Sequence, residues 1–197
     1  RPRDRRSTGS HLSDSEKTDH YLKAMLERFR KEESVFVPLS METRITPKYS
    51  TAAENRDFEK IDHALELYDH RMILIGDPGA GKSTTLRDLM RAHIRQYKQQ
   101  QTIKLPLWID LGYSENPVDA ADLIRFWWME QAGLHGDPES ALKLGTLSLF
   151  LDGLNEMPEA NGSRQARAAS LRQFIHHYPH IAVIVTCRVS LRSCTRR

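Results

Sequence analysis

The chain has 197 residues, of which 39% are hydrophobic and 28% are charged, a composition typical of one folded domain with or without an appendage. Its longest apolar runs, Ile181–Val185 and Phe126–Met129, are much shorter than the roughly 20 residues that cross a bilayer. No secretory segment opens the chain, so we expect a cytoplasmic protein with no membrane partner. The net charge of +3 comes from arginines near the two ends, whereas a nucleic-acid-binding groove needs cations on one folded face; we expect no nucleic-acid partner.

The first 70 residues carry weak structural signals. Residues 1–17 are polar and show no apolar periodicity, so we expect a disordered basic arm. Apolar residues recur at helical spacing over residues 18–31, which predicts an amphipathic helix. Residues 35–39 then predict a short extended segment, residues 40–54 a polar connector, and residues 57–68 a second helix.

From residue 71 onward, predicted strands and helices alternate. The predicted strands are continuous apolar runs at residues 71–75, 105–111, 147–151 and 181–186. The predicted helices cover residues 82–96, 116–132 and 165–176. Continuous apolar runs are typical of strands buried on both faces, and the alternation favours right-handed crossovers. We therefore expect an α/β fold, a parallel sheet with helices on both faces.

Local signals set the expected boundaries. The helix over 116–132 is expected to begin at Asn116, a residue type that caps helix N-termini well. The whole pattern divides the chain into a disordered basic arm (1–17), an N-terminal helix with an extended linker (18–55), an α/β core (56–190) and a tail (191–197).

A glycine-rich turn follows the first strand of the core and matches the pattern G-x-x-x-x-G-K-[ST]. Its residues are Gly76, Asp77, Pro78, Gly79, Ala80, Gly81, Lys82 and Ser83, with Thr84 directly after them. Glycines let the main chain wrap around phosphate groups with its N–H groups pointing inward, and the following helix adds the positive end of its dipole. Lys82 supplies a charge for the outer phosphates, and the Ser83 hydroxyl is a hard ligand for Mg²⁺. The alternative is an ordinary glycine-rich turn between a strand and a helix. The match to the full motif in that context favours the phosphate loop.

A second motif lies where the strand at 147–151 ends in Asp152. Ligands of α/β sheets bind at the carboxyl ends of the strands, so we expect Asp152 near the Mg²⁺ of a nucleotide. Glu156 is a candidate to orient or activate the attacking water. The alternative interpretation of Asp152 is a cap for the turn that follows it.

Three segments together resemble the NACHT family, which are P-loop NTPases of the class of signal-transduction ATPases with numerous domains. They are the phosphate loop, LFLDGLNEMP at 149–158 and IAVIVTCR at 181–188. In that family a small residue follows the metal-binding Asp, as Gly153 does here. A later strand ends in a polar residue plus Arg near the γ-phosphate, which Thr186 and Arg188 resemble. The resemblance covers about residues 20–190.

This resemblance implies a P-loop NTPase three-layer sandwich that binds ATP or ADP with Mg²⁺ and switches between closed and oligomeric states. It implies catalytic roles for Lys82, Asp152, Glu156 and Arg188, and places the magnesium ion on Ser83 and Asp152. It further implies a bacterial member acting in signalling or defence, self-association, and effector and sensor domains that lie outside this sequence.

Two departures from the family pattern leave the function open. Asn155 stands where the family has a second acidic residue, and because an amide cannot act as a general base, we expect slow hydrolysis. The chain also stops nine residues after Arg188, before the family's last core strand and helical lid, so we expect a fragment or a degenerate product. The open interpretations are a slow Mg²⁺-dependent ATPase switch, a nucleotide-gated binding or oligomerisation module without significant turnover, and a non-functional fragment. The resemblance favours ATP over GTP.

Overall fold

The computed structural model describes residues 13–31, 41–45, 54–58, 71–159 and 163–188. In chain order its elements are α1 (Asp14–Lys31), β1 (Met41–Ile45), β2 (Glu54–Phe58), β3 (Arg71–Gly76), α3 (Lys82–Lys98), β4 (Leu105–Asp110), α4 (Ala120–Phe126), the π-helical turn η1 (Trp127–Gln131), α5 (Glu139–Lys143), β5 (Leu147–Asp152), the 3₁₀ turn η2 (Leu154–Glu156), α6 (Arg164–His177) and β6 (Ala182–Arg188). None of the described helices has the length and hydropathy needed to cross a membrane.

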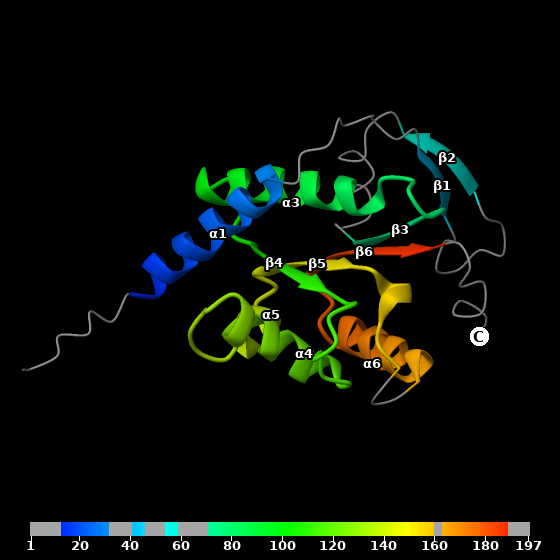
Figure 1. The fold of residues 1–197 in the computed structure, drawn as a ribbon. Helices are drawn as coiled ribbons and strands as arrows, with labels where there is room; N and C mark the ends of the chain where they lie inside the picture. Colours follow the sequence, from blue (N-terminus) through cyan, green and yellow to red (C-terminus); the bar gives the residue numbers. More distant parts are fainter. Residues whose placement is uncertain (1–12, 32–40, 46–53, 59–70, 160–162, 189–197) are drawn as a thin grey trace, which may run out of the picture.

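Four parallel strands form the main sheet in the order β3-β6-β5-β4. Helices α1 and α3 lie on one side of this sheet and α4, α5 and α6 lie on the other, which gives three layers (Figure 1). The predicted α/β sandwich is therefore confirmed. Because the strands are parallel, their carboxyl ends meet at one edge, where Gly76 is the register partner of Arg188 and Asp110 the partner of Asp152.

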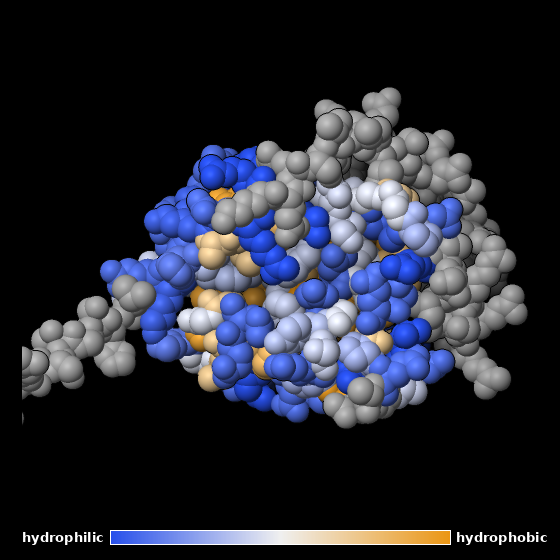
Figure 2. Space-filling view, in the orientation of Figure 1, coloured by the Kyte–Doolittle hydropathy of each residue, from blue (hydrophilic) through white to orange (hydrophobic). Residues whose placement is uncertain are grey.

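The strands change from buried to accessible at that edge. The first five residues of β4 and of β5 are buried, and so are the first six of β6. The last residue of each strand, Asp110, Asp152 or Arg188, is at least partly accessible. In β4, β5 and β6 a continuous apolar run thus fixes the strand between two helical layers, and the polar residue that ends it faces the edge of the sheet. The expected burial on both faces is wrong for β3, where Leu74 is buried but Ile73 and Ile75 are exposed, because β3 is an outermost strand among the described residues. Figure 2 shows that hydrophilic residues cover most of the face in view, with apolar residues visible only in small areas between them.

Helix α1 begins at Asp14, four residues before the predicted start. Ser13 and Glu16 form a capping box: the Ser13 N–H donates to Glu16 Oε2 at 2.7 Å, and the Glu16 N–H donates back to Ser13 Oγ at 3.3 Å. These reciprocal bonds satisfy main-chain donors that the first turn leaves unpaired. The remainder of the predicted basic arm, residues 1–12, lies outside the described residues.

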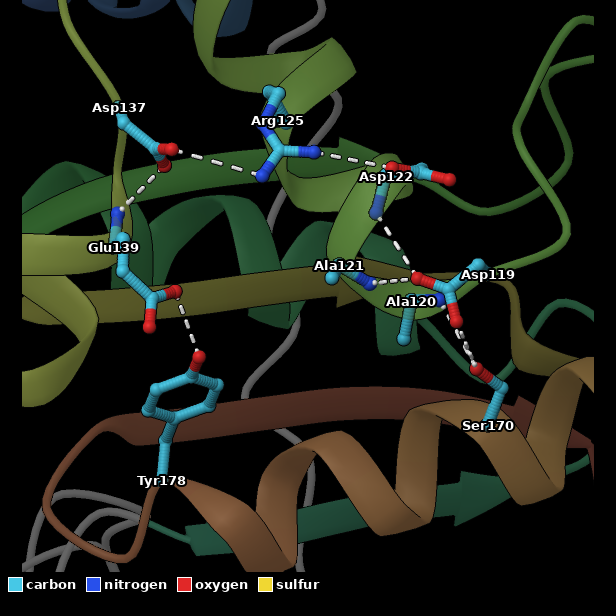
Figure 3. Close-up of polar contacts among 9 residues, drawn as sticks. All are labelled: Asp119, Ala120, Ala121, Asp122, Arg125, Asp137, Glu139, Ser170 and Tyr178. Atoms are coloured by element: carbon cyan, nitrogen blue, oxygen red, sulfur yellow. Dashed lines mark hydrogen bonds and ion pairs between the residues drawn. The ribbon is translucent and has the colours of Figure 1, made fainter.

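The predicted helix over 116–132 is wrong at its start. Asp119 caps α4, accepting from the N–H groups of Ala121 at 2.8 Å and Asp122 at 3.2 Å, so the cap lies three residues after Asn116 and the helix begins at Ala120 (Figure 3). The same close-up shows two links between neighbouring helices. Ser170 of α6 donates to Asp119, and Tyr178 after α6 donates to Glu139 of α5 at 2.8 Å.

The segment predicted as a polar connector contains β1, which pairs with β2 in antiparallel register from Met41 opposite Phe58 to Ile45 opposite Glu54. The first two residues of the predicted helix over 57–68 therefore belong to a strand. The rest of that helix, the extended segment at 35–39 and the tail at 191–197 lie outside the described residues.

Candidate nucleotide-binding site

The loop from Gly76 to Gly81 connects β3 to α3 at the carboxyl edge of the sheet. Gly79 and Gly81 both have a φ of 79°, in the left-handed region that glycine adopts without strain. A Cβ on Gly76 would lie 3.4 Å from Cβ of Ala80, so the loop folds closely on itself. Gly81 caps α3 without a side-chain hydrogen bond, and the first turn of the helix contains no acidic residue. The loop and the helix start therefore offer main-chain N–H groups and a positive dipole to an anion.

Lys82 folds back over this loop. Its Nζ donates to the carbonyl oxygens of Gly76 at 2.8 Å and Asp77 at 2.6 Å. Main-chain carbonyls are neutral acceptors, and an ionised phosphate oxygen is a stronger partner for an ammonium group. The lysine thus lies at the loop with partners that an anionic ligand could replace.

Ser83 and Asp152 come together although they lie 69 residues apart in the chain. Ser83 Oγ, in the first turn of α3, donates to Asp152 Oδ1 at 2.8 Å, and Thr186 Oγ1 donates to the same oxygen at 2.5 Å. A hydroxyl and a carboxylate are the hard oxygen ligands that Mg²⁺ prefers, and this ion usually takes few ligands from the protein, with phosphate and water supplying the rest. One hydroxyl and one carboxylate therefore fit Mg²⁺ bound together with phosphate.

Glu156 and Arg188 form an ion pair beside this site. Arg188 Nη2 donates to Glu156 Oε1 at 2.7 Å, with 45% of the arginine side chain and 51% of the glutamate side chain exposed. The Arg188 main-chain N–H also donates to Asn155 Oδ1 at 3.0 Å. The end of β6 is therefore tied to η2 twice, once through the main chain and once through the side chain.

The three-dimensional arrangement thus brings a phosphate loop, a serine and carboxylate pair and an arginine to one edge of the sheet. The family model of the NACHT domain matches residues 70–196, which is more than half of the chain and contains all of these groups. The chain belongs to the NACHT domain family. The match confirms the family resemblance seen in the sequence, and a nucleotide-binding NTPase module follows from it. A search of the curated proteins found no match.

Most of the residues expected at the site of this NACHT domain lie together at the carboxyl edge. The eight residues of the phosphate loop and Thr84 connect β3 to α3, and Asp152, Glu156 and Arg188 follow or end the neighbouring strands β5 and β6. Pro78 and Asp77 are exposed at the tip of the loop, and Thr84 is partly buried in the first turn of α3. The binding roles and the catalytic roles of these residues both stay proposals.

Sequence reasoning missed the contacts of Asn155 and Thr186 within this NACHT domain. Asn155 looked like a lost catalytic carboxylate, yet its side chain holds the main chain of Arg188. Thr186 looked like a residue near the γ-phosphate, yet its hydroxyl contacts Asp152 and Gly153. No local pattern marks either contact, because each one depends on the register between β5 and β6.

Proposed function

We propose that this NACHT domain binds ATP and ADP with Mg²⁺ and acts as a switch whose ATP hydrolysis is slow. One observation carries the proposal: the charged and polar groups of the site are held by partners within the protein that a magnesium nucleotide would replace. Lys82 rests on two loop carbonyls, Ser83 on Asp152, and Arg188 on Glu156. A nucleotide-free site that satisfies its own groups exchanges these contacts for stronger ones when phosphate binds.

In the proposed complex, the loop N–H groups and Lys82 hold the phosphates, while Ser83 and Asp152 hold the Mg²⁺ ion. When bound, the ion would neutralise the negative charge that develops on the phosphate oxygens. The residues of the chain contribute mainly by position and electrostatics, as in other phosphoryl-transfer sites. Arg188 is the register partner of Gly76, so its main chain lies beside the first residue of the loop.

Slow turnover follows from the partners of Glu156. A carboxylate that orients water must be able to turn towards that water, whereas Oε1 of Glu156 is held by a charge-assisted hydrogen bond from Arg188 at 2.7 Å. Its neighbour Asn155 cannot replace it, because an amide does not accept a proton at neutral pH. We therefore expect hydrolysis to be slow while the ion pair is closed, and the terminal phosphate of ATP is an anion that competes with Glu156 for Arg188.

The deciding experiment is a titration with labelled ATP, ADP and GTP, with and without Mg²⁺, on the wild type and Lys82→Ala. Loss of a charge-assisted contact to phosphate is expected to weaken binding about 10- to 100-fold. Lys143→Ala is the matched control, because Lys143 is an exposed lysine of α5 whose partner is Glu139. Equal affinity of Lys82→Ala and the wild type would contradict the proposal. Tighter binding of GTP than of ATP would replace ATP by GTP as the proposed ligand.

A second candidate function is a nucleotide-gated assembly module without significant turnover. The contact that favours it is the one between Asn155 and the Arg188 N–H, which gives Asn155 a structural task in place of a catalytic one. Asn155→Asp keeps an acceptor oxygen for that N–H and adds a carboxylate. A strong rise in ATP turnover in this variant supports the slow switch, and unchanged turnover together with ATP-dependent self-association supports the assembly module.

We further propose that the protein is cytoplasmic and works with effector and sensor domains.

A further inference from the structure

Thr186 lies at the centre of the site without access to solvent. It is the fifth residue of β6, and only 2% of its surface is exposed. Its hydroxyl accepts the N–H of Gly153 at 2.8 Å and donates to Asp152 Oδ1 at 2.5 Å. A threonine hydroxyl has one proton to donate, and that proton is committed to Asp152.

The hydrogen bond that Thr186 accepts orients the one that it donates. The Gly153 N–H occupies one lone pair of the hydroxyl oxygen and so fixes the direction in which its proton points. That proton points at Asp152, whose Oδ1 also accepts from Ser83 at 2.8 Å. Among the described residues, Oδ2 of Asp152 forms no hydrogen bond or ion pair, so the carboxylate is held by one oxygen and presents the other.

Ser83 and Thr186 differ in how firmly they hold Asp152. Ser83 is partly accessible and belongs to the loop and helix start that would contact phosphate. Thr186 is buried in a central strand, and its branched Cβ restricts the side-chain torsion to few rotamers. The threonine is therefore the partner whose position does not depend on the state of the loop.

We infer that Thr186 is the positioning residue of Asp152: its buried hydroxyl, oriented by the Gly153 N–H, fixes the carboxylate so that Oδ2 faces the cation of the bound nucleotide. This inference rests on the proposed function, since it concerns the same Mg²⁺. Thr186 itself touches neither phosphate nor cation, and it acts only through Asp152. It is distinct from a residue that contacts the γ-phosphate, because its one proton already has an acceptor.

The test compares Thr186→Val, which keeps the shape and removes the hydroxyl, with Thr186→Ser, which keeps the hydroxyl. Ser148→Ala is the matched control, because Ser148 is also 2% exposed in the same sheet but its hydroxyl contacts His93, far along β5 from Asp152. ATP affinity is measured in EDTA and over a series of Mg²⁺ concentrations. Loss of a contact that orients a metal ligand typically lowers metal affinity 10- to 100-fold.

We expect Thr186→Val to need about 10- to 100-fold more Mg²⁺ for the half-maximal rise in ATP affinity, with its affinity in EDTA within about twofold of the wild type. Thr186→Ser and Ser148→Ala should keep the Mg²⁺ dependence of the wild type. An unchanged Mg²⁺ dependence in Thr186→Val overturns the inference. An equal loss of affinity in EDTA and in Mg²⁺ also overturns it, because it indicates a structural role alone. Absence of ATP binding by the wild type counts against the proposed function instead.

Crystal structures without nucleotide give a second readout that does not depend on binding. The wild type should keep Asp152 Oδ1 within hydrogen-bond distance of both hydroxyls, and Thr186→Val should show the carboxylate rotated or in several conformations. An unmoved carboxylate in the variant overturns the inference. Valine also leaves the Gly153 N–H without its acceptor, so Thr186→Ala, which leaves room for a water molecule at that N–H, replaces it in both measurements if Thr186→Val does not fold.

Discussion

The hydroxyl of Tyr21 accepts the main-chain N–H of Trp108 at 3.0 Å, and both groups are buried. Trp108 belongs to β4, which pairs with β5 on one side and is the outermost of the described strands on the other. Helix α1 thus supplies the acceptor that a further strand would otherwise supply. The ring of Phe29 from the same helix packs edge-on against the indole of Trp108, with 5.0 Å between the ring centroids.

Replacing Tyr21 by Phe should lower the free energy of unfolding by about 1–3 kcal/mol, the usual effect of leaving a buried donor without a partner. The side chain keeps its ring, so packing changes little. Burial raises the pKa of Tyr21 far above its usual range, so the hydroxyl stays protonated and the effect should not vary between pH 6 and 9. Urea denaturation measures the loss, with Tyr113→Phe as a control whose hydroxyl donates to the exposed Glu115. Equal stability of Tyr21→Phe and wild type would show that water replaces the hydroxyl.

A chain that starts at residue 32 should be much less stable, although the family match begins only at residue 70. Four apolar or aromatic side chains of α1 are buried, namely Tyr21, Leu22, Met25 and Phe29. Burying each such side chain contributes about 1.5–3 kcal/mol, and their removal also uncovers the outer edge of β4. We therefore propose that α1 belongs to the folded core. A shortened chain that unfolds at the same urea concentration as the full chain would contradict this.

Asp19 links α1 to α3, and its protonation should weaken that link in acid. Asp19 accepts from Lys23 at 2.5 Å and from Lys98 of α3 at 2.8 Å, and these hydrogen bonds lower the pKa of its carboxyl from 3.8 to about 2. A lowered pKa in the folded state means that the stabilisation is present above about pH 4 and is lost as the pH falls towards 2. Because the group is exposed, the effect should be small and should decrease with salt.

Thermal unfolding of wild type and Asp19→Asn between pH 2 and 6 checks this prediction. The two proteins should differ above pH 4 and converge near pH 2. Lys98→Met should reproduce the loss of the contact between helices, whereas Lys23→Met removes only a contact within α1. A difference between wild type and Asp19→Asn that does not depend on pH would rule out the carboxylate as its source.

The order of the core elements could be predicted because each strand is a continuous apolar run, which burial on both faces explains for β4, β5 and β6 but not for β3, where Ile73 and Ile75 are exposed. Helix starts were harder to predict, for two different reasons. The cap at Asn116 failed because its side chain has tertiary partners: it donates to the Asp110 carbonyl and accepts from the Trp127 indole. The start at Asp14 has a local signal, the capping box of Ser13 and Glu16. It was missed because the residues around it are polar and show no apolar periodicity.

The site shows the same division between local and tertiary signals. Lys82 and Ser83 belong to a contiguous motif whose chemistry fixes both residue type and spacing. The pair of Glu156 and Arg188 spans 32 residues, and the register of β5 against β6 decides that the two side chains meet. A sequence therefore predicts which residues reach the carboxyl edge, while their partners there follow only from the fold.

Gly153→Ala should impair the site more than a matched change elsewhere. Gly153 has a φ of 80°, and a Cβ there would lie 3.2 Å from Oε2 of Glu156. Gly133 also has a positive φ, 64°, but a Cβ on it would meet nothing within 4 Å. Both variants should lose about 1–2 kcal/mol from the left-handed conformation, measured by urea denaturation. Only Gly153→Ala should also change ATP turnover, because only there does the new methyl group push against Glu156. An equal effect of both variants on turnover would contradict the steric argument.

Glu156→Gln should separate the two roles of Glu156 in the proposed switch. Glutamine keeps an acceptor for Arg188 but loses the charge and the capacity to accept a proton from water. If Glu156 orients the attacking water, turnover of ATP should fall about 100-fold or more, while ATP affinity stays the same or rises. ATP affinity rises if Arg188, which no longer faces a charged carboxylate, contacts the phosphate more readily. Glu159→Gln is the control, since Glu159 is an exposed carboxylate that pairs with Arg164 outside the site. Turnover that is unchanged in Glu156→Gln would remove Glu156 from the catalytic residues and would favour the assembly module.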